Sequence, residues 1–202
     1  QGADGGPTLQ TRSGSDIVVV GDSITARYVD RVGDEEQGWW SMVGHRLERP
    51  VDTYAQSGSG YLRHGAHCTG TTFAERTGAL DRPPPAVFII EGGRNDWATC
   101  RGTTIVPASN AAIASAVDAY LDLVARALPD STRVVVLGPP WGPLQPIEEA
   151  VVTPIVRQSA LAHGFEFVDT TGTLPAENVL DGVHPNRAGN EAIARRVLAA
   201  LA

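Results

Sequence analysis

The sequence predicts an α/β protein in which helices cover both faces of a central parallel sheet of about five strands, a three-layer α/β/α sandwich. Two observations carry this prediction. Short runs rich in valine and isoleucine alternate along the chain with longer segments of helical pattern. The runs are apolar throughout instead of alternating between apolar and polar residues, which indicates strands that are buried on both faces.

Five runs are predicted to be strands. The first, "DIVVV", stops at a glycine, and the third follows the three prolines of "PPPAVFIIEGG". Their shortness and their content of β-branched residues are typical of buried strands. The predicted strands are residues 16–20, 51–55, 86–91, 133–138 and 165–169.

Four segments are predicted to be helices. The clearest is "ASNAAIASAVDAYLDLVARAL", in which alanine, leucine and valine recur every three or four residues until Pro129 closes it. The polar, glycine-rich stretch 56–82 is expected to form loops with one short helix. The predicted helices are residues 39–48, 108–128, 146–163 and 187–201.

Composition limits the class of protein. The chain has 202 residues, 42% of them hydrophobic, which suits one domain with a core. Sixteen basic against 23 acidic side chains give a net charge of -7, which argues against a nucleic-acid partner. No apolar run reaches the ~20 residues that cross a bilayer. We expect residues 1–14 to be a flexible lead and residues 15–202 to be a single domain.

The two cysteines, Cys68 and Cys100, allow two interpretations. They are either free, partly buried thiols or a disulfide in an exported protein, and a loop of this length would stabilise the fold by roughly 3–4 kcal/mol. No Cys-x-x-Cys pair is present, so a zinc or redox site is not expected. The cysteine pair and the start of the chain at Gln1 lead us to expect a secreted or cell-envelope protein.

Polar motifs follow the predicted strands at their carboxyl ends. "GDSI" follows the first, "AQSGSG" the second and "EGGRND" the third, while "LDGVHPN" comes between the fifth strand and the last helix. Functional residues of parallel α/β folds gather at this edge of the sheet. The four motifs are therefore expected to meet in space.

In this order, the motifs resemble those of the SGNH hydrolases, also called the GDSL esterase/lipase family, over residues 16 to about 190. The resemblance implies a flavodoxin-like sandwich and a serine hydrolase. It makes Ser23 the nucleophile and Asp181 and His184 its partners in a catalytic triad. It also implies an oxyanion hole built by Ser23, Gly58 and Asn95, with Gly60 as the alternative glycine.

The chemistry of these residues agrees with the resemblance. A serine hydroxyl becomes a good nucleophile when a base accepts its proton, and histidine can do so near neutral pH. A carboxylate three residues away, Asp181, can hold the ring of His184 in one tautomer. Attack on an ester creates an oxyanion, which the N–H groups of Ser23 and Gly58 and the amide of Asn95 can stabilise.

Each motif also has a structural interpretation. Ser23 can be a helix N-cap, and Asn95 and Asp181 can be turn residues. Asp96 is expected to be structural. The remaining histidines are expected at the surface or in ordinary hydrogen bonds, and no metal site is predicted: His45, His64, His67 and His163.

Further residues near the motifs are candidates for the substrate pocket. Trp141 is either a packing lid or a platform for substrate, and Tyr61 and Arg63 are equally ambiguous. The candidates are Asp22, Tyr61, Arg94, Trp97, Trp141 and Val183.

The function predicted from the sequence is hydrolysis of carboxylic esters through an acyl-enzyme, without a metal or organic cofactor. Short acyl chains are favoured, and the substrate is a small ester, of a sugar or a lipid among others. Two alternatives remain. One is an acyltransferase with a carbohydrate or lipid acceptor, and the other is a non-catalytic carbohydrate-binding module on the same scaffold.

Overall fold

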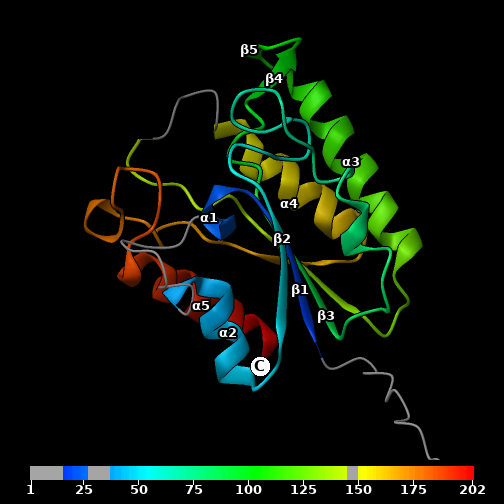
Figure 1. Ribbon diagram of the computed structural model, residues 1–202, viewed down its shortest axis with the longest axis vertical. Helices are drawn as coiled ribbons and strands as arrows, with labels where there is room; N and C mark the ends of the chain where they lie inside the picture. The colour runs from blue at the N-terminus through cyan, green and yellow to red at the C-terminus, as the bar shows by residue number, and fades with distance from the viewer. Residues whose placement is uncertain (1–15, 27–36, 145–149) are drawn as a thin grey trace, which may run out of the picture.

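The computed structural model describes residues 16–26, 37–144 and 150–202. Five parallel strands form its central sheet in the order β2-β1-β3-β6-β7 (Figure 1). Each strand lies within one residue of its predicted bounds, and the predicted fold class is confirmed. The strands are β1 (Ile17–Gly21), β2 (Val51–Ala55), β3 (Val87–Glu91), β6 (Arg133–Leu137) and β7 (Glu166–Val168).

The strands are nearly in register. Gly21 of β1 pairs with Ala55 of β2, and Glu91 of β3 pairs with Leu137 of β6. Val20 pairs with Ile90, one residue before the end of each strand. The carboxyl ends of the four strands therefore lie at one level, and the loops that follow them start from a common edge.

Helices cover both faces of the sheet. Figure 1 shows α2 (Trp39–Leu47) and α5 (Arg187–Leu201) on one side, and α3 (Asn110–Ala127) and α4 (Val152–Ala162) on the other. Because successive side chains of a strand point to opposite faces, each strand contributes to both layers.

The core is accordingly divided in two by the sheet. Val18 and Val20 of β1 belong to the cluster that includes the buried residues of α3 and α4, such as Val117. Ile17 and Val19 belong to the cluster of α2 and α5. β1 and β3, in the middle of the sheet, are buried at every residue because both of their faces are covered, as the sequence predicted, whereas the edge strand β2 is partly exposed at Asp52 and Thr53.

The helices agree with the predictions apart from their ends. α3 begins two residues later than predicted, after Ser109, whose side chain accepts a hydrogen bond from the Ala112 N–H. α4 tolerates Pro154 because this residue lies in the first turn, where an N–H has no partner within the helix. Residues 146–149 of the predicted helix lie outside the described residues.

The segment after β1, where the sequence allowed a helix beginning at Ser23, forms one helical turn, and a short hairpin was not predicted. A single helical turn, α1 (Ser23–Ala26), follows β1, and an antiparallel hairpin of β4 (Ala98–Arg101) and β5 (Thr104–Pro107) lies beyond the end of β3. The 3₁₀ turns η2 (Thr77–Ala79) and η4 (Ala176–Asn178) complete the elements, and η2 is the short helix expected within 56–82.

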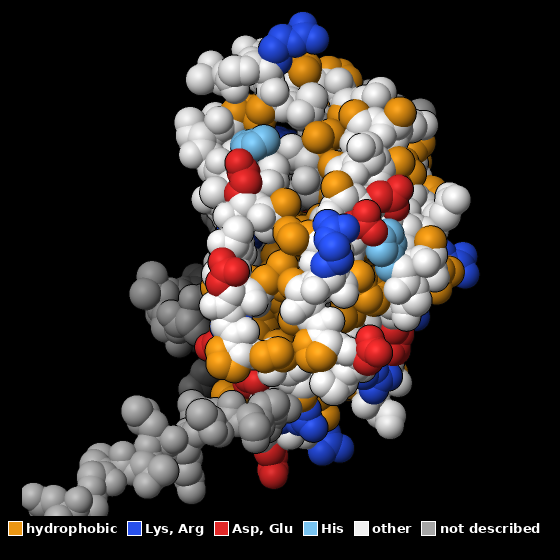
Figure 2. All heavy atoms as spheres, turned by 90° about the vertical axis from the view of Figure 1, so that its right-hand side faces the viewer, with side chains coloured by type: hydrophobic (Ala, Val, Ile, Leu, Met, Phe, Trp, Pro, Cys, Tyr) orange, Lys and Arg blue, Asp and Glu red, His pale blue; other side chains and the backbone are white. Residues whose placement is uncertain are grey.

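The predicted lead, residues 1–14, lies outside the described residues. None of the helices in the described part of the chain is long and apolar enough to cross a bilayer. The side of the molecule covered by α3 carries apolar, acidic and basic side chains side by side (Figure 2).

Candidate active site

The motifs that follow the strands meet at the carboxyl edge of the sheet. Ser23 begins α1, two residues after the end of β1, and its hydroxyl lies 3.0 Å from Nε2 of His184. The other ring nitrogen of His184, Nδ1, lies 2.7 Å from Oδ2 of Asp181. Nucleophile, base and carboxylate thus form one continuous chain of hydrogen bonds across 161 residues of sequence.

The loop of Asp181 fixes its own carboxylate. The second oxygen, Oδ1, accepts hydrogen bonds from the N–H groups of Val183 at 3.1 Å and His184 at 2.8 Å. Gly182, at a φ of 82°, allows the tight turn. Leu180 donates its N–H to the His184 carbonyl and closes the loop.

These hydrogen bonds also determine the charge of the carboxylate. Partial burial raises the pKa of Asp181, but the hydrogen bonds from the backbone and side chain of His184 and from Val183 outweigh it and lower that pKa to about 2. Asp181 is therefore ionised at neutral pH. An ionised carboxylate at this distance favours the tautomer of His184 that carries its proton on Nδ1 and accepts through Nε2.

A glycine stands at the position where the second motif approaches the nucleophile. Gly58 has a φ of 73°, and a Cβ built on it would lie 2.4 Å from the backbone of Ala66. Only glycine fits there. Gly60, the alternative, lies deeper, where a Cβ would lie 2.3 Å from the Asp96 carboxylate.

Asn95 reaches the same point from the loop after β3. Its Nδ2 donates to the carbonyl of Ser59 at 2.9 Å and lies 3.4 Å from Oδ2 of Asp22. In the described part of the chain, the N–H groups of Ser23 and Gly58 donate to no protein acceptor. These N–H groups are therefore available to a substrate.

A pocket of about 370 Å³ opens beside Ser23. Three of the predicted pocket residues line it: Arg94, Trp97 and Val183. Sequence reasoning did not place Ser57, Ala66 or Leu144 there, and it left Arg63 ambiguous. The full lining is Ser23, Ser57, Gly58, Arg63, Ala66, Arg94, Asn95, Trp97, Leu144, Val183 and His184.

Three predicted pocket residues lie elsewhere. Asp22 is fully buried, and its Oδ1 accepts the N–H of Ile24 at 2.8 Å. Tyr61 is in the core, because its ring packs edge to face against Phe73 and Tyr120. The Trp141 indole donates to the Thr153 hydroxyl and has the Arg94 guanidinium over its ring. Trp141 therefore contacts Arg94, which lines the pocket, but does not line the pocket itself.

A buried acid beneath the nucleophile escaped prediction. Glu91, the last residue of β3, is fully buried, and its Oε2 accepts hydrogen bonds from the Thr25 hydroxyl at 2.8 Å and the Asp22 N–H at 3.4 Å. Burial, and next the Asp22 carboxyl, raise the pKa of Glu91 well above its ordinary value. Burial also raises the pKa of Asp22, to about 6. The sequence signal was an acid that ends an otherwise apolar strand.

Asp96, adjacent to Asn95, is structural as expected. Its carboxylate accepts the N–H groups of Tyr61 at 3.0 Å, Leu62 at 2.8 Å and Arg63 at 3.1 Å. It thereby fastens the loop that follows Gly58 to the motif that carries Asn95.

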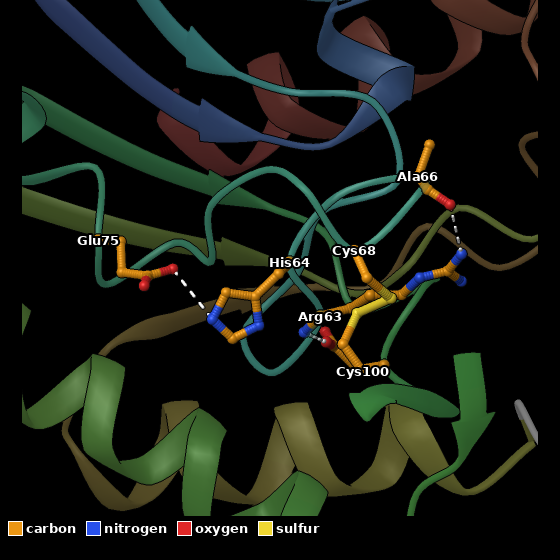
Figure 3. The surroundings of a disulfide bond; sticks show 7 residues. Arg63, His64, Ala66, Cys68, Glu75 and Cys100 are labelled. Carbon is orange, nitrogen blue, oxygen red and sulfur yellow. Dashed lines mark hydrogen bonds and ion pairs between the residues drawn. A yellow bond between two sulfur atoms is a disulfide. The ribbon is translucent and has the colours of Figure 1, made fainter. Parts of the chain in front are cut away.

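The two cysteines form a disulfide, with their Cα atoms 5.6 Å apart. Figure 3 shows the Arg63 side chain beside this bond, extending toward the carbonyl of Ala66, to which its Nη2 donates at 3.4 Å. The bond joins the loop after β2 to β4 and so links the segments of Gly58 and Asn95 a second time.

Two histidines, His64 and His67, come shortly before Cys68 in the sequence. Nε2 of His64 lies 3.3 Å from Oε2 of Glu75 (Figure 3). Among the described residues, no group of three or more histidine, cysteine, aspartate and glutamate side chains has an arrangement that could hold a metal ion.

Known proteins share this architecture. A carbohydrate acetylesterase from Sinorhizobium meliloti has a TM-score of 0.73 at 16% identity, over 93% of this chain and 100% of that chain. A family two carbohydrate esterase from Clostridium thermocellum, solved in complex with cellohexaose, has a TM-score of 0.74 at 18% identity, over 93% of this chain and 63% of that chain. At these identities the likeness concerns the fold.

Sequence comparison identifies the family. A GDSL lipase of Mycobacterium tuberculosis is 29% identical in an alignment 197 residues long, which covers 90% of this chain and 79% of that protein. The model of the GDSL-like lipase/acylhydrolase family matches residues 19–192, so the match includes all four motifs. The chain therefore belongs to the GDSL-like lipase/acylhydrolase family and is a serine hydrolase of the esterase class.

Proposed function

We propose that this esterase hydrolyses short-chain carboxylic esters of polar alcohols, acetylated sugars foremost, through a covalent acyl-enzyme. The observation that carries the proposal is the hydrogen-bonded chain from Ser23 through His184 to Asp181 at the wall of the pocket. It gives a hydroxyl, a base and an orienting carboxylate in the geometry that nucleophilic catalysis requires.

In the acylation step, the Ser23 Oγ attacks the carbonyl carbon of the ester while Nε2 of His184 takes the hydroxyl proton. The tetrahedral intermediate then collapses, and the same nitrogen returns the proton to the oxygen of the leaving alcohol. Asp181 stays ionised and stabilises the imidazolium that exists between these two transfers.

The negative charge of the intermediate is stabilised by the N–H groups of Ser23 and Gly58 and the Asn95 amide. Such donors act strongly because they are already oriented when the charge develops, and the loss of one typically lowers the rate ~10²–10³-fold. In the deacylation step, a water molecule takes the place of the alcohol and attacks the acyl carbon, while His184 takes a proton from that water. His184 then returns the proton to the Ser23 Oγ as the carboxylic acid leaves.

The proposed substrate class is supported by the pocket and by the related structures. A volume of about 370 Å³, at the small end of ligand pockets, suits a short acyl group. Ser57, Arg63 and Arg94 line part of the pocket with hydrogen-bond donors, which suit a polar alcohol such as a sugar. Two proteins of similar fold are described as carbohydrate esterases.

We also propose that the protein works outside the cytoplasm, secreted or in the cell envelope. The disulfide supports this location, because such bonds persist in oxidising compartments. Fractionation of cells that produce the native protein, followed by detection with an antibody, tests the location.

Replacing Ser23 by alanine tests the function. The variant should keep its circular dichroism spectrum and lose hydrolysis of p-nitrophenyl acetate by at least ~10³-fold, together with covalent labelling by a fluorophosphonate. Undiminished turnover would refute the assigned nucleophile. A series of p-nitrophenyl esters from C2 to C16, measured beside acetylated sugars, tests the acyl length. Acyl transfer to an added carbohydrate in preference to water would identify a transferase instead.

A further inference from the structure

Arg76 lies in the loop between β2 and β3, and no motif or assigned role accounts for it. Its guanidinium bridges the strand ends that support the site. Nη1 donates to the carbonyl of Gly21, the last residue of β1, at 2.8 Å and to the carbonyl of Tyr54 in β2 at 2.7 Å. Nη2 donates to the Ser59 hydroxyl at 2.8 Å. One side chain thus links the strand that leads to Ser23 with the loop that carries Gly58.

The guanidinium is fixed from its other sides as well. It lies over the ring of Phe73 with its Cζ 4.9 Å from the ring centroid, and Nε donates to the Thr72 carbonyl at 3.4 Å. A planar group with donors in a rigid fork can reach four separate acceptors and stack on an aromatic ring at the same time. A lysine ammonium at this position could not make all of these contacts.

Ser59 connects Arg76 to the oxyanion hole. It is fully buried, and its hydroxyl, which receives the bond from Arg76, donates in turn to the Gln56 carbonyl at 2.7 Å. The backbone carbonyl of Ser59 accepts the hydrogen bond from Nδ2 of Asn95 at 2.9 Å. A shift of Ser59 therefore moves the acceptor that orients Asn95, and it also moves the neighbouring N–H of Gly58.

We infer that Arg76 is a positioning residue for the oxyanion hole, which it holds in place relative to Ser23 through Ser59. The inference rests on the proposed function, because it assigns Arg76 to the support of the donors Gly58 and Asn95. Arg76 does not line the pocket. Its effect should therefore appear in the rate of the chemical step and leave the binding of substrate unchanged.

The primary experiment replaces Arg76 by glutamine and measures kcat and KM for p-nitrophenyl acetate. We expect kcat to fall ~10–100-fold with KM nearly unchanged, because the loss of an oxyanion donor itself costs ~10²–10³-fold. The matched control is Arg82→Gln. Arg82 bridges the same two strands at their opposite ends, through ion pairs with Asp16 and Asp52. This control should lower the melting temperature and leave kcat unchanged at 25 °C.

A double-mutant cycle with Asn95→Ala separates positioning from general stabilisation. If Arg76 acts through Asn95, the double variant should be little slower than Asn95→Ala alone. In that variant the Asn95 amide is absent, so replacing Arg76 removes support from a donor that no longer exists. Full multiplication of the two single effects would overturn the inference. So would equal losses of kcat in Arg76→Gln and Arg82→Gln.

Two further variants keep the test decisive if Arg76→Gln folds poorly. Arg76→Lys keeps the charge without the fork and should remain slow, so wild-type kcat in this variant would overturn the inference. Ser59→Ala removes the Arg76 contact while the backbone carbonyl remains, and it should lower kcat by a smaller factor. An inactive wild-type protein, or a fully active Ser23→Ala variant, would instead refute the proposed function.

Discussion

Removing the disulfide between Cys68 and Cys100 should lower stability far more than activity. The change to be made is the double replacement of both cysteines by serine, because a single replacement would leave a reactive thiol beside the site. The bond joins the loop after β2 to β4, and the same two segments are also joined by the hydrogen bonds of Asp96 to residues 61–63. The site should therefore keep its geometry in the folded variant.

The magnitude follows from the 32 residues that separate the cysteines. In the chain-entropy model, a loop of that length removes about 12 cal/mol/K from the unfolded chain, which is about 3.7 kcal/mol at 25 °C. For a chain of about 200 residues, each kcal/mol corresponds to ~2–4 °C in melting temperature. The expected decrease is therefore about 7–15 °C.

The assay compares thermal unfolding of the two proteins by circular dichroism, with the wild-type protein measured in the presence and absence of a reductant. Reductant should lower the melting temperature of the wild-type protein toward that of the double variant and leave the double variant unchanged. Hydrolysis of p-nitrophenyl acetate at 25 °C should stay close to the wild-type rate. This pair of readouts separates a stabilising cross-link from one that the chemistry needs.

Two results would refute the reasoning. A decrease smaller than about 2 °C would mean that the bond constrains the unfolded chain far less than its loop length requires. A large loss of kcat in a variant that is fully folded at 25 °C would mean that the hydrogen bonds of Asp96 do not suffice to hold the two segments together.

Three further predictions follow from the site. Gly58→Ala should lower kcat at least ~10²-fold, because its Cβ would lie 2.4 Å from the backbone of Ala66 and displace an oxyanion donor, so a wild-type kcat would contradict the assignment of that donor. Asp181→Asn should lower kcat by ~10²–10⁴-fold but less than His184→Ala does, because an amide at position 181 orients the His184 ring poorly but leaves the base in place. Steady-state kinetics of the two variants shows which of them loses more activity. Glu91→Gln should keep the activity and make the free energy of unfolding decrease less as pH rises. Because the pKa of Glu91 is raised in the folded state, the unfolded chain loses the Glu91 proton above about pH 4.3 while the folded protein still keeps it. The free energy of unfolding of the wild-type protein therefore decreases as pH rises. Urea unfolding at pH 5 and pH 8 measures that difference, and equal pH dependence in the two proteins would contradict it.

The sheet could be predicted from the sequence because burial on both faces requires an unbroken apolar run, which is a local pattern. β1 and β3 are examples, since each has all five residues buried. The hairpin of β4 and β5 was missed for the opposite reason. Its strands are short and only partly buried, with threonines and a turn at Gly102, so they have neither an apolar run nor a regular alternation.

The residues at the strand ends were also predictable, because a parallel sheet brings all of its carboxyl ends to one edge. The remaining site residues depend on how the loops fold, which no local pattern records. Tyr61 was expected in the pocket, yet the hydrogen bond from its N–H to Asp96 and the rings of Phe73 and Tyr120 direct it into the core. Arg76 lies in a polar stretch that resembles any surface loop, and only the four carbonyl and hydroxyl acceptors that surround it make it distinctive.

These unpredicted contacts have a common physical cause. An oxyanion hole built from loops has no neighbouring strand to satisfy its backbone groups, and a buried N–H or carbonyl without a partner destabilises the fold. Side chains take the place of that strand. Asp96 accepts three N–H groups of the loop that follows Gly58, and Asp181 accepts two in the loop of His184. Arg76 donates to two carbonyls at the strand ends. The charged side chains around this site are therefore required to hold its loops in place, whether or not they contact the substrate. Their replacement should change the rate by changing the positions of the catalytic groups.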